Sequence, residues 1–138
     1  MTDTERTLVL LKPDAVRRGL VGTILARFEA KSLSIAAMDM RRIDAAMADR
    51  HYADHVGKDW YPPLRDYITG GPLVALVLEG PSVIDVVRLM VGATNAAQAA
   101  PGTIRGDLAL SNRENLVHAS DSVESATREM SLWFPGLT

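Results

Sequence analysis

The sequence has 138 residues, of which 47% are hydrophobic and 23% are charged, and it contains no cysteine. This length and composition predict one globular domain over residues 1–138 that folds without disulfides or a structural metal. A net charge of −2 argues against general binding to nucleic acid. The longest apolar run, Leu73–Leu78, is far too short to cross a membrane, and the acidic, polar start is unlike a secretory signal. These features predict a cytoplasmic protein without a membrane partner.

The first half of the chain has the pattern of a strand, a helix and a strand, followed by two short helices. Thr7–Lys12 is a continuous apolar run, typical of a strand buried on both faces. Apolar residues at helical spacing predict a helix over Gly22–Lys31, and Leu33–Met40 has a strand pattern. Ala45–Tyr52 and Pro63–Thr69 then predict a pair of short helices around a loop.

The second half begins with the strand Leu73–Leu78, which two glycines and a proline precede. Ser82 and Asp85 form a capping-box pattern, which predicts the start of a helix that runs to about Val91. Residues 92–107 show no clear period. Irregular segments of this length inside a compact domain are usually functional or disordered, so this one is a candidate part of a site.

A short strand over Leu116–Ala119 leads into a final helix, which Asp121 and Glu124 would cap. Without the pair of short helices, the element order is β-α-β-β-α-β, the order of a ferredoxin-like fold. We therefore predict an α+β protein with an antiparallel sheet covered by helices. The helical pair would be inserted between the second and third strands.

His118 stands at the end of the last predicted strand, directly before a helix. Alternation along the strand would put it on the same face as Leu116, as expected for a core histidine. However, Ser120 and Asp121 follow at a helix N-terminus, where free N–H groups and the helix dipole attract anions. A neutral imidazole beside an anion site is a candidate phosphate acceptor. The residues alone leave both interpretations open.

Phosphate binding requires cations, and the sequence offers several candidates with competing explanations. Lys12 ends an apolar strand, and Arg88 follows Asp85 by three residues, so it would also suit an exposed ion pair. Arg105 lies between glycines that would let the backbone approach a ligand closely. Lys58 has the context of a surface residue. Neither G-x-x-x-x-G-K-[ST] nor G-x-G-x-x-G occurs, so a nucleotide site would use another arrangement.

His51 and His55 are four residues apart, a spacing that puts both on one face of a helix, as ligands of one metal ion require. The H-E-x-x-H motif is absent, and no third ligand is obvious nearby. A solvated helix end is the competing interpretation. A small metal hydrolase is therefore one alternative for the function of this chain.

Three segments in this order resemble the nucleoside diphosphate kinases, and the resemblance extends from Glu5 to Phe134 without a large insertion. They are Arg6-Thr-Leu-Val-Leu-Leu-Lys-Pro-Asp14, Gly92-Ala-Thr-Asn95 with Pro101-Gly-Thr-Ile-Arg-Gly-Asp107, and Asn115-Leu-Val-His-Ala-Ser-Asp121. The resemblance implies a ferredoxin-like fold and ping-pong transfer of a γ-phosphate between nucleoside tri- and diphosphates of any base. It implies Mg²⁺ held mainly by the nucleotide phosphates, and a homohexamer, with a homotetramer as the alternative.

The resemblance also implies individual roles. His118 would be the nucleophile and would take the phosphate on Nδ1, while Glu129 would bond its imidazole and fix the tautomer. Tyr52 would bond near the histidine and the transferring phosphate, and Lys12 would complete the catalytic group. The nucleotide would be bound at its phosphates by Arg88, Thr94 and Arg105, at its sugar by Lys12 and Asn115, and at its base by Trp60. The helical pair and the long loop would form the two walls of the cleft.

Three positions depart from the family pattern: Ala96 replaces a common proline, Asn112 an often apolar residue, and Ala119 the usual glycine after the histidine. Ala119 would impair transfer if this position needed a positive φ or very close approach of phosphate. No departure removes a catalytic side chain, so we expect an active enzyme. The alternative from another class is a nucleotide-binding regulatory or scaffold protein without turnover.

Overall fold

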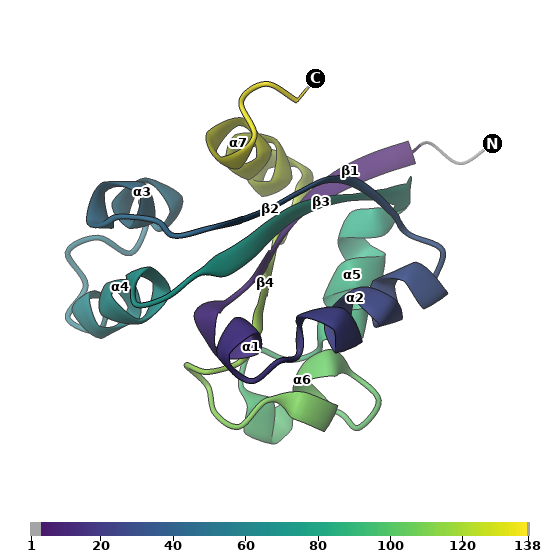
Figure 1. The fold of residues 1–138 in the computed structure, drawn as a ribbon, viewed down its shortest axis with the longest axis horizontal. Helices are drawn as coiled ribbons and strands as arrows, with labels where there is room; N and C mark the ends of the chain where they lie inside the picture. Colours follow the sequence, from purple (N-terminus) through teal and green to yellow (C-terminus); the bar gives the residue numbers. More distant parts are fainter. Residues whose placement is uncertain (1–3, 138) are drawn as a thin grey trace.

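A computed structural model describes residues 4–137, which form a four-stranded antiparallel sheet in the order β2-β3-β1-β4 with helices on both faces (Figure 1). The strands are β1 (Thr4–Leu11), β2 (Ser34–Arg41), β3 (Leu73–Pro81) and β4 (Val117–Ala119). The helices are α1 (Pro13–Arg17), α2 (Val21–Ala30), α3 (Ala45–His51), α4 (Tyr61–Thr69), α5 (Val83–Val91), the 3-10 helix η1 (Ala96–Gln98), α6 (Ile104–Leu108) and α7 (Val123–Trp133). The predicted α+β, ferredoxin-like fold is confirmed, with α3 and α4 inserted between β2 and β3.

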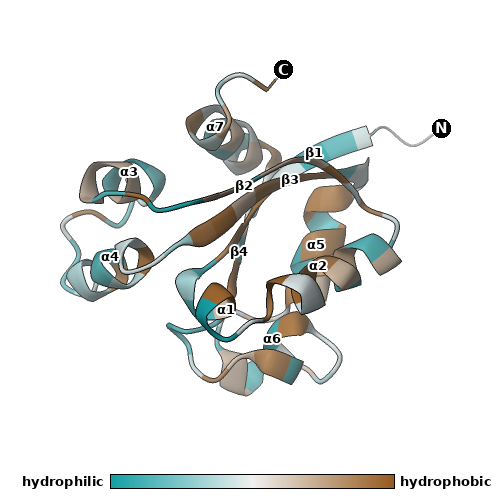
Figure 2. Cartoon of the chain, in the orientation of Figure 1, coloured by the Kyte–Doolittle hydropathy of each residue, from teal (hydrophilic) through white to brown (hydrophobic). Residues whose placement is uncertain are grey.

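Strand β1 lies inside the sheet and is buried on both faces, as its apolar run predicts. Leu8 to Leu11 have no exposed surface. Val9 and Leu11 pack in the layer that contains α2 and α5, while Leu8 and Leu10 pack in the layer of α3, α4 and α7. Both layers are therefore built around one strand, and the apolar character of β3 and α5 is visible in Figure 2. None of the helices within residues 4–137 has the length and apolar character needed to cross a bilayer.

Helix α5 begins after Ser82 and ends at Val91, as predicted, but the capping of α5 and of α7 differs from the sequence prediction. Ser82 precedes α5 with φ 52° and makes no side-chain cap bond, so the capping-box pattern there is not used. Helix α7 begins after Ser122, whose hydroxyl accepts the N–H of Ser125, and not at Asp121. Capping depends on the dihedrals of the residue before the helix, which the residue types alone do not determine.

Two α-helices, α1 and α6, were not predicted, and neither was the 3-10 helix η1. Helix α1 has only five residues and begins at Pro13, directly after the segment predicted as the first strand. In the segment expected to be irregular, α6 starts where the Thr103 hydroxyl accepts the N–H of Gly106. Both helices are too short to show hydrophobic periodicity, and the rest of the structure supports them.

The buried face of α2 gives a direct test of the packing. Phe28 has no exposed surface, and replacement by alanine is expected to lower the free energy of unfolding by about 3–5 kcal/mol, because it removes apolar contacts and leaves a cavity. Glu29→Ala on the exposed side of the same helix should change it by less than about 0.5 kcal/mol. Urea unfolding at one fixed protein concentration measures both. Equal losses would contradict the assignment of the buried face.

Candidate functional site

One cleft of about 770 Å³ contains every residue that the sequence assigns to the site. Its walls come from the α3–α4 region and from residues 94–115, and β4 and α7 also contribute lining residues. The predicted site residues that line it are Lys12, Tyr52, Trp60, Arg88, Thr94, Arg105, Asn115, His118 and Glu129. Residues up to 117 positions apart in the chain thus meet at one surface, as the two-wall arrangement requires.

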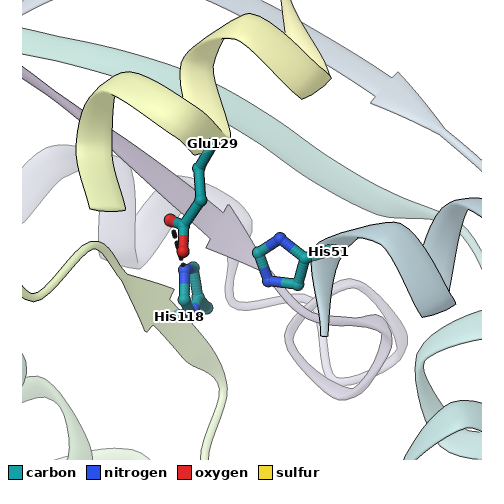
Figure 3. A group of neighbouring side chains, drawn as sticks. All are labelled: His51, His118 and Glu129. Carbon is teal, nitrogen blue, oxygen red and sulfur yellow. Dashed lines mark hydrogen bonds and ion pairs between the residues drawn. The ribbon is translucent and has the colours of Figure 1, made fainter. Parts of the chain in front are cut away.

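His118 is held by the carboxylate of Glu129, the residue that the family resemblance implied as its partner. Its Nε2 lies 2.8 Å from Oε1 of Glu129, which is 6% exposed (Figure 3). A carboxylate only accepts hydrogen bonds, so Nε2 carries the proton and Nδ1 of a neutral ring keeps a free electron pair. The geometry therefore prepares Nδ1 for attack on an electrophile.

Ser120 supports this pair in a way that its position in the sequence does not reveal. Its buried hydroxyl donates to the same Oε1 of Glu129 at 2.7 Å. Burial alone would raise the pKa of Glu129, but the hydrogen bond and charge of His118 and the bond from Ser120 outweigh it and lower that pKa. Glu129 therefore stays ionised in the interior, where it faces the imidazole.

The second histidine near the nucleophile is His51, and it is not at a solvated helix end as proposed. His51 is 3% exposed, and its ring lies 4.7 Å from that of His118, nearly perpendicular to it (Figure 3). The indole N–H of Trp133 donates to His51 Nδ1 at 3.0 Å. Burial, and then the charge of His118, lower the pKa of His51 to about 3, so this ring is neutral.

The alternative of a metal site on His51 and His55 gains no support, because His55 belongs to no group of three or more potential metal ligands among residues 4–137. His55 instead stacks against Tyr52, with ring centroids 5.6 Å apart, and contacts Trp60. Ligand atoms of His51, His118 and Glu129 do lie within 4.8 Å of one another. However, the bond from Trp133 occupies Nδ1 of His51 and leaves the proton on Nε2, so His51 has no free electron pair for a metal.

Lys12 and Asn115 are joined in the base of the cleft. The ammonium group of Lys12 donates to Asn115 Oδ1 at 2.9 Å, while the amide of Asn115 donates to the carbonyls of Thr94 and Asn112. Burial, and then the charge of Arg105, lower the pKa of Lys12 to about 8, against an opposing effect of Asp14. The positive charge of Lys12 is therefore poorly compensated within the protein, as expected for a group that binds an anion.

Most hydrogen bonds of the Arg105 side chain are made within the protein. Its guanidinium donates to the carbonyls of Gly92, Asn115 and Val117, and burial followed by the charge of Arg88 lowers its pKa to about 10. It therefore connects the long loop to β4 and places its remaining N–H groups at the cleft. Arg88 is exposed at the cleft wall, and no ion pair with Asp85 is found among the described residues.

Glycines near Arg105 in the structure are needed where the backbone of the long loop packs closely. A Cβ at Gly106 would lie 1.9 Å from the carbonyl oxygen of Ala100, and one at Gly92 would lie 2.6 Å from Oγ1 of Thr103. Gly102 has φ 93° with open space beside it. Close packing of the loop therefore requires glycine at positions 92 and 106, while the approach of a ligand to the backbone near Arg105 stays a prediction.

Two aromatic residues assigned to the site, Trp60 and Tyr52, also line the cleft. Trp60 is 52% exposed beside His55, so it is not a packing residue of the helical pair. Tyr52 is largely buried, and burial raises its pKa, so its hydroxyl stays protonated.

The departures from the family pattern leave the cleft intact. Ala119 lies in β4 opposite Val9 and is not among the described residues with positive φ, so its methyl group causes no backbone strain. Asn112 accepts the amide of Asn115 through its carbonyl, a contact that any residue type would supply. Ala96 begins η1, which Asn95 caps.

Comparison with known proteins agrees with this geometry. The family profile described as "Nucleoside diphosphate kinase" matches residues 5–137. A nucleoside diphosphate kinase of a Nocardioides species is 74% identical over 96% of this chain and 98% of its own length, and that of Cutibacterium acnes is 59% identical over 99% of each.

Solved structures show the same similarity. The nucleoside diphosphate kinase of Aquifex aeolicus superimposes with a TM-score of 0.94 at 38% identity, covering 97% of each chain. That of Halobacterium salinarum, in complex with CDP, has a TM-score of 0.93 at 44% identity over 96% of this chain and 88% of its own. The chain therefore belongs to the nucleoside diphosphate kinase family.

Proposed function

We propose that this nucleoside diphosphate kinase, a single domain, transfers the γ-phosphate of a nucleoside triphosphate to a nucleoside diphosphate by way of a phosphohistidine at His118. The observation that carries the proposal is the 2.8 Å bond between His118 Nε2 and Glu129 in a cleft lined by cationic side chains. It supports Nδ1 as the nucleophile. The relative solved with CDP supports nucleotides as the ligands of the cleft.

The reaction has two half-steps that share one site. The free electron pair of Nδ1 attacks the γ-phosphorus, and the bond to the β–γ bridging oxygen breaks, so the nucleoside diphosphate leaves with that electron pair. The imidazole keeps its Nε2 proton, and the charge that develops on the ring is stabilised by Glu129. A terminal oxygen of a second nucleoside diphosphate then attacks the phosphorus and releases His118 unchanged.

The cationic side chains supply what phosphoryl transfer needs, namely positioning and neutralisation of negative charge. Arg88, Arg105 and the Thr94 hydroxyl would contact the phosphates, and Lys12 with Asn115 would contact the sugar hydroxyls. The Tyr52 hydroxyl would donate near the transferred group, since its raised pKa keeps it protonated. Loss of one such donor typically costs about 10²–10³ in rate.

The divalent cation would enter as part of the substrate, as a magnesium nucleotide. Mg²⁺ prefers oxygen ligands and keeps several waters. Of the carboxylates that line the cleft, Glu129 is bonded to His118 and Ser120, and Asp121 is bonded by Ser125, which lowers its pKa. This donor set supports Mg²⁺ held mainly by the nucleotide phosphates.

The edge of the sheet supports a homo-oligomer. β2 is one of the two edge strands of the sheet, and within residues 4–137 no strand pairs with its free edge. Met38 and Met40 are 52% and 56% exposed there, and exposed apolar edges usually mark contacts with another chain. We propose a homohexamer, with a homotetramer as the alternative, acting in the cytoplasm without a nucleic-acid or membrane partner.

Replacement of His118 by alanine should abolish phosphate exchange and leave nucleotide affinity within a few-fold, because the ring forms the covalent intermediate. Incubation with γ-labelled ATP should label the unmodified protein in an acid-labile, base-stable form, as a phosphoramidate requires. The label should disappear in His118→Ala and persist in His55→Ala. An acid-stable label would exclude this mechanism. The absence of any label would also exclude it and would favour the alternative of a scaffold protein without turnover.

Lys12 should make activity fall at high pH. Its pKa of about 8 means that the ammonium is charged below this value and loses its proton as the pH rises through it. The kcat/KM, which reports ionisation of the free enzyme, should therefore decline above about pH 8. Lys12→Arg, whatever its own activity, should lack this decline because arginine stays protonated. The same decline in both proteins would assign it to another group.

Trp60→Ala should lower kcat/KM by a similar factor for adenine, guanine, cytosine and thymine nucleotides. Stacking on one exposed ring is worth about 1–3 kcal/mol per base and accepts any base, which corresponds to a loss of about 5- to 150-fold. Trp60→Phe, which keeps a ring, should retain most of the activity. Measurements with all four diphosphates test this, and a loss for one base alone would place the base elsewhere.

A further inference from the structure

The backbone between Asn115 and His118 contains a strained turn. Leu116 has φ 74°, although it is not a glycine, and the N–H of Val117 donates to the carbonyl of Asn115 at 2.9 Å. A bond between residues two apart around a positive φ defines a γ-turn of the rare, strained kind. Such a conformation persists only where surrounding contacts impose it.

This turn decides which side chains reach the cleft. Asn115 and His118 are three positions apart, so in an extended strand their side chains would point to opposite faces. In the structure both line the same cleft, while Leu116 is fully buried in the layer of α2 and α5. The turn is therefore what allows Asn115 and His118 to act on one ligand.

Asp14 holds the centre of the turn. Its Oδ2 accepts the N–H of Leu116 at 3.2 Å, and the backbone N–H of Lys12 donates to the Leu116 carbonyl at 2.8 Å. The other carboxylate oxygen of Asp14 accepts a short hydrogen bond from the Tyr67 hydroxyl. The backbone N–H and the carbonyl of Leu116 are thus both hydrogen-bonded to Lys12 and Asp14, which follow β1. Helix α4 anchors Asp14 through the hydroxyl of Tyr67.

Asp14 takes no direct part in the cleft. It is fully buried and does not line the cleft, so contact with a nucleotide does not account for a buried carboxylate at this point. We propose that Asp14, oriented by Tyr67, is a positioning residue that imposes the γ-turn at Leu116 and thereby fixes the placement of Asn115 relative to His118. This inference rests on the roles proposed for Asn115 and His118.

The test compares two variants that differ in whether they accept a hydrogen bond. Asp14→Asn loses the charge but keeps an acceptor for the Leu116 N–H, whereas Asp14→Leu keeps a side chain branched at Cγ and loses the acceptor. We expect the single-turnover rate of protein phosphorylation by γ-labelled ATP to fall about 10- to 100-fold in Asp14→Leu, as for small misplacements of reacting groups. In Asp14→Asn it should stay within about threefold, since the turn is retained.

Asp49→Ala is the matched control, because Asp49 accepts a comparable tyrosine hydrogen bond from Tyr61 at 2.7 Å, outside the turn and the cleft. It should lower thermal stability without lowering the phosphorylation rate. Full activity in a folded Asp14→Leu protein, or a loss as large in Asp14→Asn, would overturn the inference. An unmodified protein that takes no acid-labile label would instead refute the phosphohistidine itself.

If Asp14→Leu does not fold, amide hydrogen exchange in the unmodified protein decides the question. The Leu116 amide should exchange as slowly as those of β1, because a buried carboxylate accepts it. Exchange as fast as that of exposed loop amides would show that Asp14 does not hold the turn, and would overturn the inference.

Discussion

The burial of β1 on both faces is the constraint on which the site depends. A strand with apolar side chains in both layers ends in the interior, so Lys12 and Asp14 stay buried beside β4 at 7% and 0% exposure. Lys12 keeps a small exposed surface at the cleft, Asp14 has none, and each bonds the segment before the nucleophile. Lys12 bonds Asn115, and Asp14 bonds Leu116. The end of the central strand therefore also determines the geometry of the cleft floor.

The same burial explains the electrostatics of the cleft. The protein has a net charge of −2, yet burial lowers the pKa of both Lys12 and Arg105. A neighbouring positive charge lowers each pKa further, that of Arg105 for Lys12 and that of Arg88 for Arg105. Anionic phosphate groups would remove this penalty, because they bring the negative charge that the site lacks. Binding of a polyanion is thus favoured locally although the overall charge opposes it, and the site needs no glycine-rich phosphate loop.

Features that depend on neighbouring residues in the sequence were predicted, whereas features that depend on residues far apart in the sequence were not. Hydrophobic runs and spacing identified the strands and the longer helices, and motif resemblance identified the residues that line the cleft. The γ-turn at Leu116 was missed, and with it the prediction that His118 shares a face with Leu116 was wrong. No glycine marks this turn, since contacts of Asp14 and Lys12 from a hundred residues away impose it. The bond of Ser120 to Glu129 was missed because it depends on how α7 packs on the sheet.

His51 shows how the interior limits the chemistry of the nucleophile. Two imidazoles with centroids 4.7 Å apart would repel if both were charged, and burial keeps His51 neutral by lowering its pKa to about 3. The indole of Trp133 fixes its tautomer, and the same helix α7 supplies Glu129 to His118. Helix α7 thus gives two adjacent histidines different partners: an indole N–H occupies Nδ1 of His51, while a carboxylate accepts the Nε2 proton of His118 and leaves its Nδ1 free. Because Glu129 bonds the ring of His118 and burial keeps His51 neutral, a positive charge that develops during phosphoryl transfer is stabilised on His118.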